Sequence, residues 1–76
     1  MTQSRGDRSK RRTLKFIKDY INENGIPPSR REIMVGAGFS TTSSATYHVK
    51  ALEDEGKIKI IPNIARGIVV IHEEEG

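Results

Sequence analysis

The chain has 76 residues, 34% of them hydrophobic, which is enough for one domain with a modest core. It contains no cysteine, which excludes disulfides and thiolate metal ligands, and no apolar run approaches the roughly 20 residues of a membrane-spanning helix. The net charge is +3, with basic residues concentrated between residues 5 and 18 and acidic clusters at residues 53–55 and 73–75. A basic end on a small domain indicates either a polyanionic partner or a simple need for solubility.

The first helix is expected over about residues 8–23, after a flexible basic tail of residues 1–6. Asp7 is the candidate N-cap, because its carboxylate can accept a free backbone amide of the first turn. Asn24-Gly25 is a typical helix end. Apolar residues recur at helical spacing on one face: Leu14, Ile17 and Ile21. A basic stripe on this helix either tracks a phosphate strand or faces solvent: Arg8, Arg11, Lys15 and Lys18.

A second, short helix is expected to start at Ser29. Ser29 and Glu32 form an S-x-x-E capping box, a fairly specific sign of a helix N-terminus. Gly36 should weaken this helix, and Gly38 should end it. Two residues are candidates for the core: Ile33 and Ala37.

The third helix is expected to begin after Thr41, a good N-cap, and to end at Gly56. One of its faces is apolar and predicts burial: Ala45, Val49 and Leu52. The opposite face is small and polar, with one tyrosine: Ser43, Tyr47, Lys50 and Asp54. His48 falls on the edge of the apolar stripe, where a lone histidine is more often structural than a ligand.

Residues 57–61 and 68–71 predict two strands, and residues 62–67 hold the turn residues of a hairpin loop. We also expect a short extra strand near Ile26, pairing with the hairpin. Two strands alone are marginally stable, so the hairpin must pack on the helices. The predicted fold class is small α+β, a winged helix-turn-helix of three helices followed by a two-stranded antiparallel wing, within a domain of residues 7–72.

The second and third helices, joined by residues 37–40, form a helix-turn-helix pattern. In this motif one helix presents polar side chains to base edges while its back packs on a core. Four residues suit that task, although a solvated helix face is the alternative: Ser43, Ser44, Thr46 and Tyr47. Five basic residues are candidates for phosphate contacts, against the alternative of exposed charges with no ligand: Arg30, Arg31, Lys50, Lys59 and Arg66.

The sequence gives little support for catalysis. The two histidines, His48 and His72, lie far apart and have no evident catalytic partners. Ser29 is better explained as a cap than as a nucleophile, and no glycine-rich phosphate-binding motif follows a strand. We therefore expect no enzyme, no metal, no cofactor and no small-molecule ligand.

The run at residues 16–21 and the run at residues 25–33 resemble the amino-terminal domain of LexA repressors. The pattern G-x-P-P-[ST]-x-x-E-I at residues 25–33 is the most specific part of this resemblance. Residues 48–53 and 56–58 look like the recognition helix and its exit, and residues 65–68 look like the wing. The resemblance covers roughly residues 8 to 75 without a gap.

The resemblance implies a cytoplasmic, nucleoid-associated repressor of DNA-damage (SOS) response genes that binds palindromic operators in double-stranded DNA as a dimer. The family's base-reading positions match five residues here: Thr41, Ser43, Ser44, Thr46 and Tyr47. The familiar enterobacterial form has an asparagine at the position of Ser43 and acids at those of Thr46 and Tyr47. These departures concern the operator sequence rather than DNA binding.

LexA repressors also carry a carboxy-terminal domain, with a serine–lysine pair for self-cleavage and the main dimer contacts. The 76 residues do not include it, so residues 73–76 are expected to be an acidic tail or the start of a linker. The chain is then either one domain of a longer repressor or a stand-alone relative. Both readings stay open.

Two functions from different classes remain. The first is sequence-specific DNA binding by the third helix, with the wing and helix ends on phosphates. The second is a winged-helix module that docks another protein through the same helix. The small polar face favours the first, because a docking face usually offers more large apolar anchors than one tyrosine.

Overall fold

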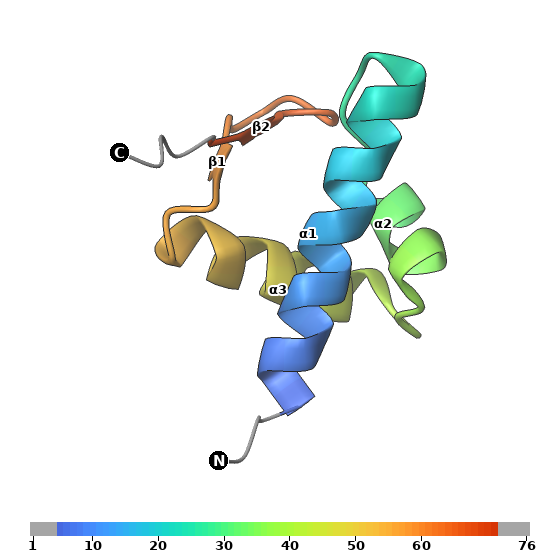
Figure 1. Ribbon diagram of the computed structural model, residues 1–76, viewed down its shortest axis with the longest axis vertical. Helices are drawn as coiled ribbons and strands as arrows, with labels where there is room; N and C mark the ends of the chain where they lie inside the picture. Colours follow the sequence, from blue (N-terminus) through green and yellow to red (C-terminus); the bar gives the residue numbers. More distant parts are fainter. Residues whose placement is uncertain (1–4, 72–76) are drawn as a thin grey trace.

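The computed structural model describes the backbone of residues 5–71 and the side chains of residues 8–71. Three helices are followed by two strands: α1 (Arg5–Asn24), α2 (Arg30–Ala37), α3 (Thr42–Asp54), β1 (Ile58–Ile60) and β2 (Ile68–Val70) (Figure 1). The expected fold class, three helices followed by a two-stranded antiparallel wing, is confirmed. No helix within residues 5–71 is long and apolar enough to cross a membrane.

Helix α1 starts earlier than expected. It begins at Arg5, so Asp7 lies inside the helix and is not its N-cap, and residues 5 and 6 of the expected tail are helical. The physical reason is that Arg and Lys are good helix formers, and adding residues to an existing helix is much easier than nucleating one. The end is as expected, because the Gly25 amide donates to the Ile21 carbonyl at 2.8 Å and Gly25 has a φ of 77°. The expected tail at residues 73–76 and His72 lie outside the described residues.

The capping box of α2 is confirmed. The Ser29 hydroxyl accepts from the Glu32 amide at 3.2 Å, and the Glu32 carboxylate accepts from the Ser29 amide at 2.9 Å. The helix ends at Gly38, which adopts the left-handed conformation with a φ of 81°. Local sequence signals therefore define both ends of this eight-residue helix.

Gly36 has a packing function that the sequence did not reveal. A Cβ atom on Gly36 would collide with the ring of Phe16 on α1. The absent side chain lets α1 and α2 approach closely, which offsets the lower helix propensity of glycine.

The start of α3 is also as expected. The Thr41 hydroxyl accepts from the Ser44 amide at 3.1 Å, and the helix runs from residue 42 to residue 54. Gly56 follows with a φ of 78° and turns the chain into β1.

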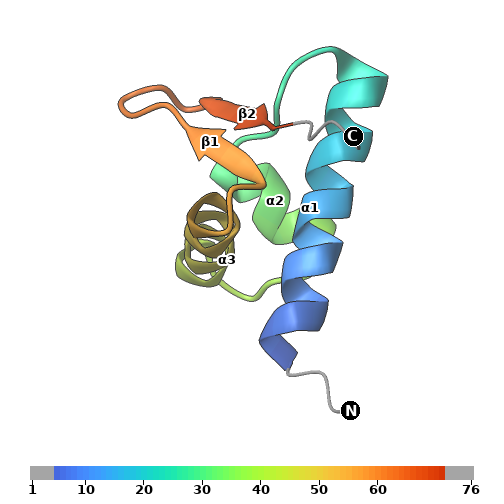
Figure 2. The same ribbon diagram turned by 60° about the vertical axis from the view of Figure 1, so that its left-hand side comes forward.

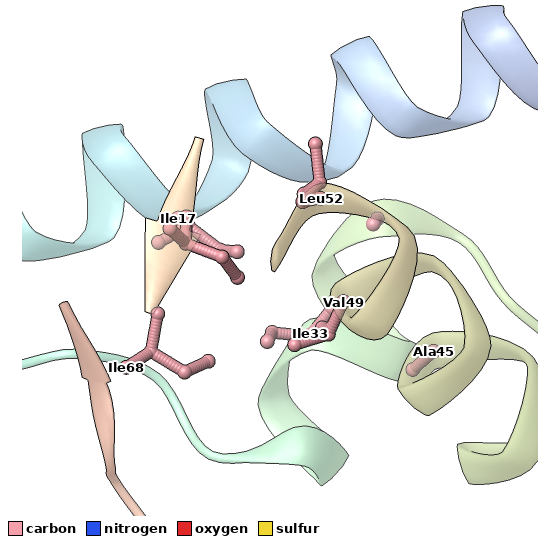
Figure 3. Close-up of a cluster of buried hydrophobic side chains, with 8 residues drawn as sticks. Ile17, Ile33, Ala45, Val49, Leu52 and Ile68 are labelled. Atoms are coloured by element: carbon pink, nitrogen blue, oxygen red, sulfur yellow. The ribbon is translucent and has the colours of Figure 1, made fainter. Parts of the chain in front are cut away.

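The core lies where the three helices and the hairpin meet, as Figure 3 shows for side chains from α1, α2, α3 and β2. The inward residues expected on α2 and α3 are all buried, and so is Ile17 of α1. Leu14 and Ile21 are half-buried and pack against the core. The buried residues of the core come from all five elements: Ile17, Ile33, Ala37, Ala45, Val49, Leu52, Ile58 and Ile68.

The wing is an antiparallel pair in which Ile58 lies opposite Val70 and Ile60 opposite Ile68. Figure 2 shows the hairpin lying across one end of the helices, with its loop turned away from α1. The expected extra strand near Ile26 is wrong, since the sheet of the described residues has two strands. The next two residues are prolines, which have no amide to donate to a ladder.

Candidate nucleic-acid interface

Helix α3 separates its residues sharply into two faces. Ala45, Val49 and Leu52 are at most 2% exposed and fix the helix to the core. On the other side Tyr47 is 68% exposed, and Ser43 and Lys50 are also exposed. The amino-terminal half of this helix thus presents polar side chains to solvent, while the buried residues fix its backbone against the core.

The five expected base-reading residues fall into two groups. Thr41 and Ser44 bond to each other, because the Thr41 hydroxyl lies 3.2 Å from the Ser44 hydroxyl and also caps the helix. Within the described residues, the side chains of Ser43, Thr46 and Tyr47 make no hydrogen bond to protein. Ser43 and Tyr47 are exposed and Thr46 is half-buried, so these three have polar groups available for a ligand.

A stack of rings supports Tyr47. Its ring meets His48 edge-on, with centroids 5.2 Å apart, and His48 stacks on Phe39 at 4.7 Å. His48 Nδ1 lies 2.8 Å from the Ser44 carbonyl oxygen, which can only accept, so this nitrogen carries a proton. His48 therefore has the structural function expected for it, and it also limits the orientations of Tyr47.

Arg12 extends this stack from α1 and was not singled out from the sequence. Its guanidinium carbon lies 5.9 Å from the centroid of Phe39. Its Nε donates to the Ala37 carbonyl at 2.8 Å, at the carboxy-terminal end of α2, where the helix leaves carbonyls without partners. Arg12 thus ties α1 to the turn between α2 and α3. No local pattern could identify this contact, because its partners lie 25 residues apart.

Basic residues lie on three elements that contact α3, which are α1, α2 and β1. Arg30 and Arg31 occupy the first turn of α2, where Arg31 is exposed and Arg30 half-buried, and neither has a hydrogen bond or ion pair within residues 5–71. Lys59 is exposed in the middle of β1. The stripe on α1 is exposed as well, but Lys15 pairs with Asp19 at 2.9 Å. Lys10, also on α1, forms an ion pair with Glu55 just after α3.

Arg66 differs from the other expected phosphate-binding residues, because protein groups already occupy its guanidinium. Two of its nitrogens donate to the two carboxylate oxygens of Glu32, at 2.6 and 2.9 Å. One of them also donates to the Pro27 carbonyl at 3.0 Å. The hydrogen bonds from Arg66 and from the Ser29 amide lower the pKa of Glu32 from 4.5 to about 2, and the bond to Glu32 raises the pKa of Arg66. Glu32 was predicted only as part of a capping box.

Within the part of the chain that the structure describes, no three histidine, cysteine, aspartate or glutamate side chains gather as metal ligands would. The side chains on and around the exposed face of α3 supply hydroxyl groups, one phenol and positive charges. Such a surface can bind a polyanion and form directional hydrogen bonds.

Comparison with known families decides what kind of domain this is. The model of the LexA DNA binding domain matches residues 7–67. The chain belongs to this family. The LexA repressor of Aeromonas hydrophila is 45% identical over 62 residues, which are 82% of this chain and 30% of that protein. The LexA repressor of Carboxydothermus hydrogenoformans is 39% identical over 64 residues, or 84% and 31% of the two chains. That of Erwinia tasmaniensis is 42% identical over 60 residues, or 79% and 30%.

The resemblance to LexA repressors noted in the sequence is therefore confirmed. The LexA match runs from α1 into the wing loop, so it includes every candidate base-reading and phosphate-binding residue. The chain spans about a third of the length of the LexA repressors it matches.

Proposed function

We propose that this LexA domain binds double-stranded DNA sequence-specifically and serves a transcriptional repressor, with α3 in the major groove. The observation that carries the proposal is the division of α3 into a buried stripe and an exposed polar face with Tyr47 68% exposed. Direct readout of base edges requires a helix that is fixed to the core by one face and presents polar side chains on the opposite face. Membership of the LexA DNA binding domain family supports the same function.

In this proposal, base readout falls to the amino-terminal half of α3, with Ser43, Thr46 and Tyr47 on the bases and Thr41 and Ser44 shaping the helix start. Phosphates are met by Arg30 and Arg31 on α2, Lys50 on α3 and Lys59 on the wing. Arg66 was expected in the same group, but its guanidinium is already bonded to Glu32 and Pro27.

The regulatory setting is part of the proposal. We propose that two copies occupy a palindromic operator that controls DNA-damage response genes, in the cytoplasm at the bacterial nucleoid. The function proposed for these residues is binding. The relatives' name, LexA repressor, supports this setting.

Selection of binding sites from random duplex DNA tests the proposal directly. An enriched palindrome is the expected result. With about four to six phosphates contacted, the logarithm of the affinity should fall with the logarithm of the salt concentration at a slope of about −4 to −5. No enrichment together with a flat salt response would contradict DNA binding and favour a protein-docking domain.

A panel of variants then separates readers from phosphate contacts. Ser43→Ala, Thr46→Ala or Tyr47→Ala should each cost about 1–3 kcal/mol on the selected site and relax discrimination there. Arg31→Ala should weaken all duplexes equally and lower the salt slope by about one. Glu23→Gln, at the far end of α1, is the control and should bind like the parent. Reader variants that bind both the selected and a scrambled duplex like the parent would remove α3 from the reading function.

A further inference from the structure

Arg66 is the point at which the wing loop is attached to the helices. It lies between the strands, in the loop that follows β1, and it donates three hydrogen bonds to Glu32 and Pro27 around the start of α2. Besides the bond to Glu32, a side-chain hydrogen bond with Tyr20 of α1 also raises the pKa of Arg66. The wing's buried side chains, Ile58 and Ile68, belong to the strands. The guanidinium of Arg66 therefore adds a second, separate attachment at the loop.

Glu32 receives two sets of hydrogen bonds on one carboxylate. Its Oε1 accepts from the Ser29 amide at 2.9 Å and from Arg66 at 2.6 Å, while its Oε2 accepts from Arg66 at 2.9 Å. The same side chain thus completes the α2 cap and holds the wing. Because Arg30 and Arg31 directly follow the capping residue, the wing is fixed relative to the two arginines proposed to meet phosphate.

We propose that Arg66 is a positioning residue that sets the angle of the wing against α2, and that it does not contact phosphate. This inference rests on the proposed DNA binding. A two-pronged arginine–carboxylate contact fixes orientation as well as distance, which a single lysine contact cannot do. A guanidinium that swung away to phosphate would leave the Glu32 carboxylate unpaired beside the DNA, and the repulsion would oppose binding.

The decisive variant is Glu32→Gln. Glutamine can still accept from the Ser29 amide, so the helix cap is retained, but the charged two-pronged contact is lost. If Arg66 positions the wing, Glu32→Gln and Arg66→Gln should each weaken binding to the selected duplex by about tenfold to a hundredfold. The double variant should be no weaker than Arg66→Gln, because Arg66→Gln already removes the contact with Glu32 along with the bond to Pro27. Glu23→Gln makes the same change in net charge at an exposed side chain with no hydrogen bond or ion pair within the described residues, and it should leave the affinity unchanged.

A phosphate contact by Arg66 gives the opposite pattern. Glu32→Gln would then bind as tightly as the parent or more tightly, since it removes a negative charge and releases the arginine, while Arg66→Gln would still be weak. That result would overturn the proposal.

Residual dipolar couplings of backbone amides in the free 76-residue chain give a readout that needs no DNA. The couplings of residues 58–70 should change relative to those of the helices in Glu32→Gln and in Arg66→Gln, and stay as in the parent in Glu23→Gln. An unchanged wing orientation in both variants would also overturn the proposal. Should the parent bind no duplex, the proposed function fails, and these couplings still decide whether Arg66 orients the wing. Arg66→Lys, with one donor group in place of the fork, should fall between the parent and Arg66→Gln in both measurements.

Discussion

Helix α3 has 13 residues, its own N-cap and three buried side chains, whereas each strand of the wing has three residues and one buried side chain. Both are proposed to meet the same duplex. The backbone hydrogen bonds of the helix lie within the helix, and its buried side chains fix its position against the core. The wing has only a short ladder, closed by the Ile61 amide on the Gly67 carbonyl at 2.7 Å and the Ile71 amide on the Lys57 carbonyl at 2.9 Å.

The wing is held instead by groups that belong to other elements. The Glu53 carboxylate of α3 accepts from the Ile60 amide at 3.0 Å, and Glu32 of α2 holds Arg66. Since an isolated hairpin is marginal in water, these contacts and the buried strand residues decide whether the wing forms. The effects of substitutions in α3 should therefore depend on nearby residues, whereas the effects of substitutions in the wing should depend on its distant partners.

A substitution of a buried residue in β1 tests whether the wing shares the core of the helices. Ile58 is 1% exposed in β1, and Ile58→Ala should lower the free energy of unfolding by about 2–5 kcal/mol, through lost burial and a cavity. Urea denaturation followed by circular dichroism measures it. The control is Val69→Ala on the other side of the hairpin, 47% exposed, which should change stability by less than about 0.5 kcal/mol. A small loss for Ile58→Ala would mean that the wing folds apart from the helices.

A second substitution should disturb the wing alone. A Cβ atom on Gly67 would lie 2.5 Å from the Ile61 carbonyl oxygen, so Gly67→Ala forces the loop backbone apart and should cost about 1–3 kcal/mol. Amide hydrogen exchange at Ile61 and Gly67 should then occur by local opening and be faster than exchange of the α3 amides, which requires global unfolding. Ala65→Ser, at an exposed neighbouring position, is the control. Exchange at Ile61 and Gly67 that is no faster than exchange in α3 would show that the wing and the helix do not differ in the way described above.

The start of α3 offers a smaller, purely local test. Thr41→Ala removes the hydroxyl that accepts from the Ser44 amide and should cost about 0.5–2 kcal/mol. Thr42→Ala changes the adjacent exposed threonine, which is not the cap, and should be close to neutral. Thermal unfolding of the two variants measures the difference. Equal melting temperatures would mean that α3 does not depend on its cap.

The sequence predicted those features whose causes lie within a few residues. The Ser29–Glu32 capping box, the Thr41 cap and the left-handed Gly38 are short-range signals, and the structure confirms each. The buried stripe of α3 was predictable for the same reason, because helical periodicity alone decides which residues share a face. The predicted start of α1 at Asp7 was wrong, because a favourable cap residue is only a preference and the neighbouring residues are themselves good helix formers.

Long-range contacts could not be predicted in this way. The Arg66–Glu32 pair spans 34 residues and the Arg12–Ala37 contact spans 25. An arginine in a loop looks the same in the sequence whether it reaches a carboxylate or faces solvent. The polar face of α3 was predicted as a set, but the pairing of Thr41 with Ser44 and the support of Tyr47 by His48 depend on side-chain geometry.

The smallest effect concerns the pH dependence of the contact between the wing and α2. The pKa of Glu32 is lowered from 4.5 to about 2, first by Arg66 and then by the Ser29 amide. The unfolded chain therefore binds a proton at Glu32 before the folded chain does as the pH falls. The stability that Glu32 contributes is complete above pH 4.5, decreases between pH 4.5 and 2, and is lost as the pH falls through about 2. The partial exposure of both side chains keeps this contribution modest, because solvent screens the pair.

In Glu32→Gln the free energy of unfolding should fall less steeply than in the parent between pH 4.5 and 2, and the two curves should run parallel above pH 4.5. Arg66→Gln should also flatten the curve and move the carboxyl titration of Glu32, followed by NMR, back toward 4.5. A Glu32 titration that is the same with and without Arg66 would show that the loop of the wing is not held at this carboxylate, and the contrast between the wing and α3 would then rest on the buried strand residues alone.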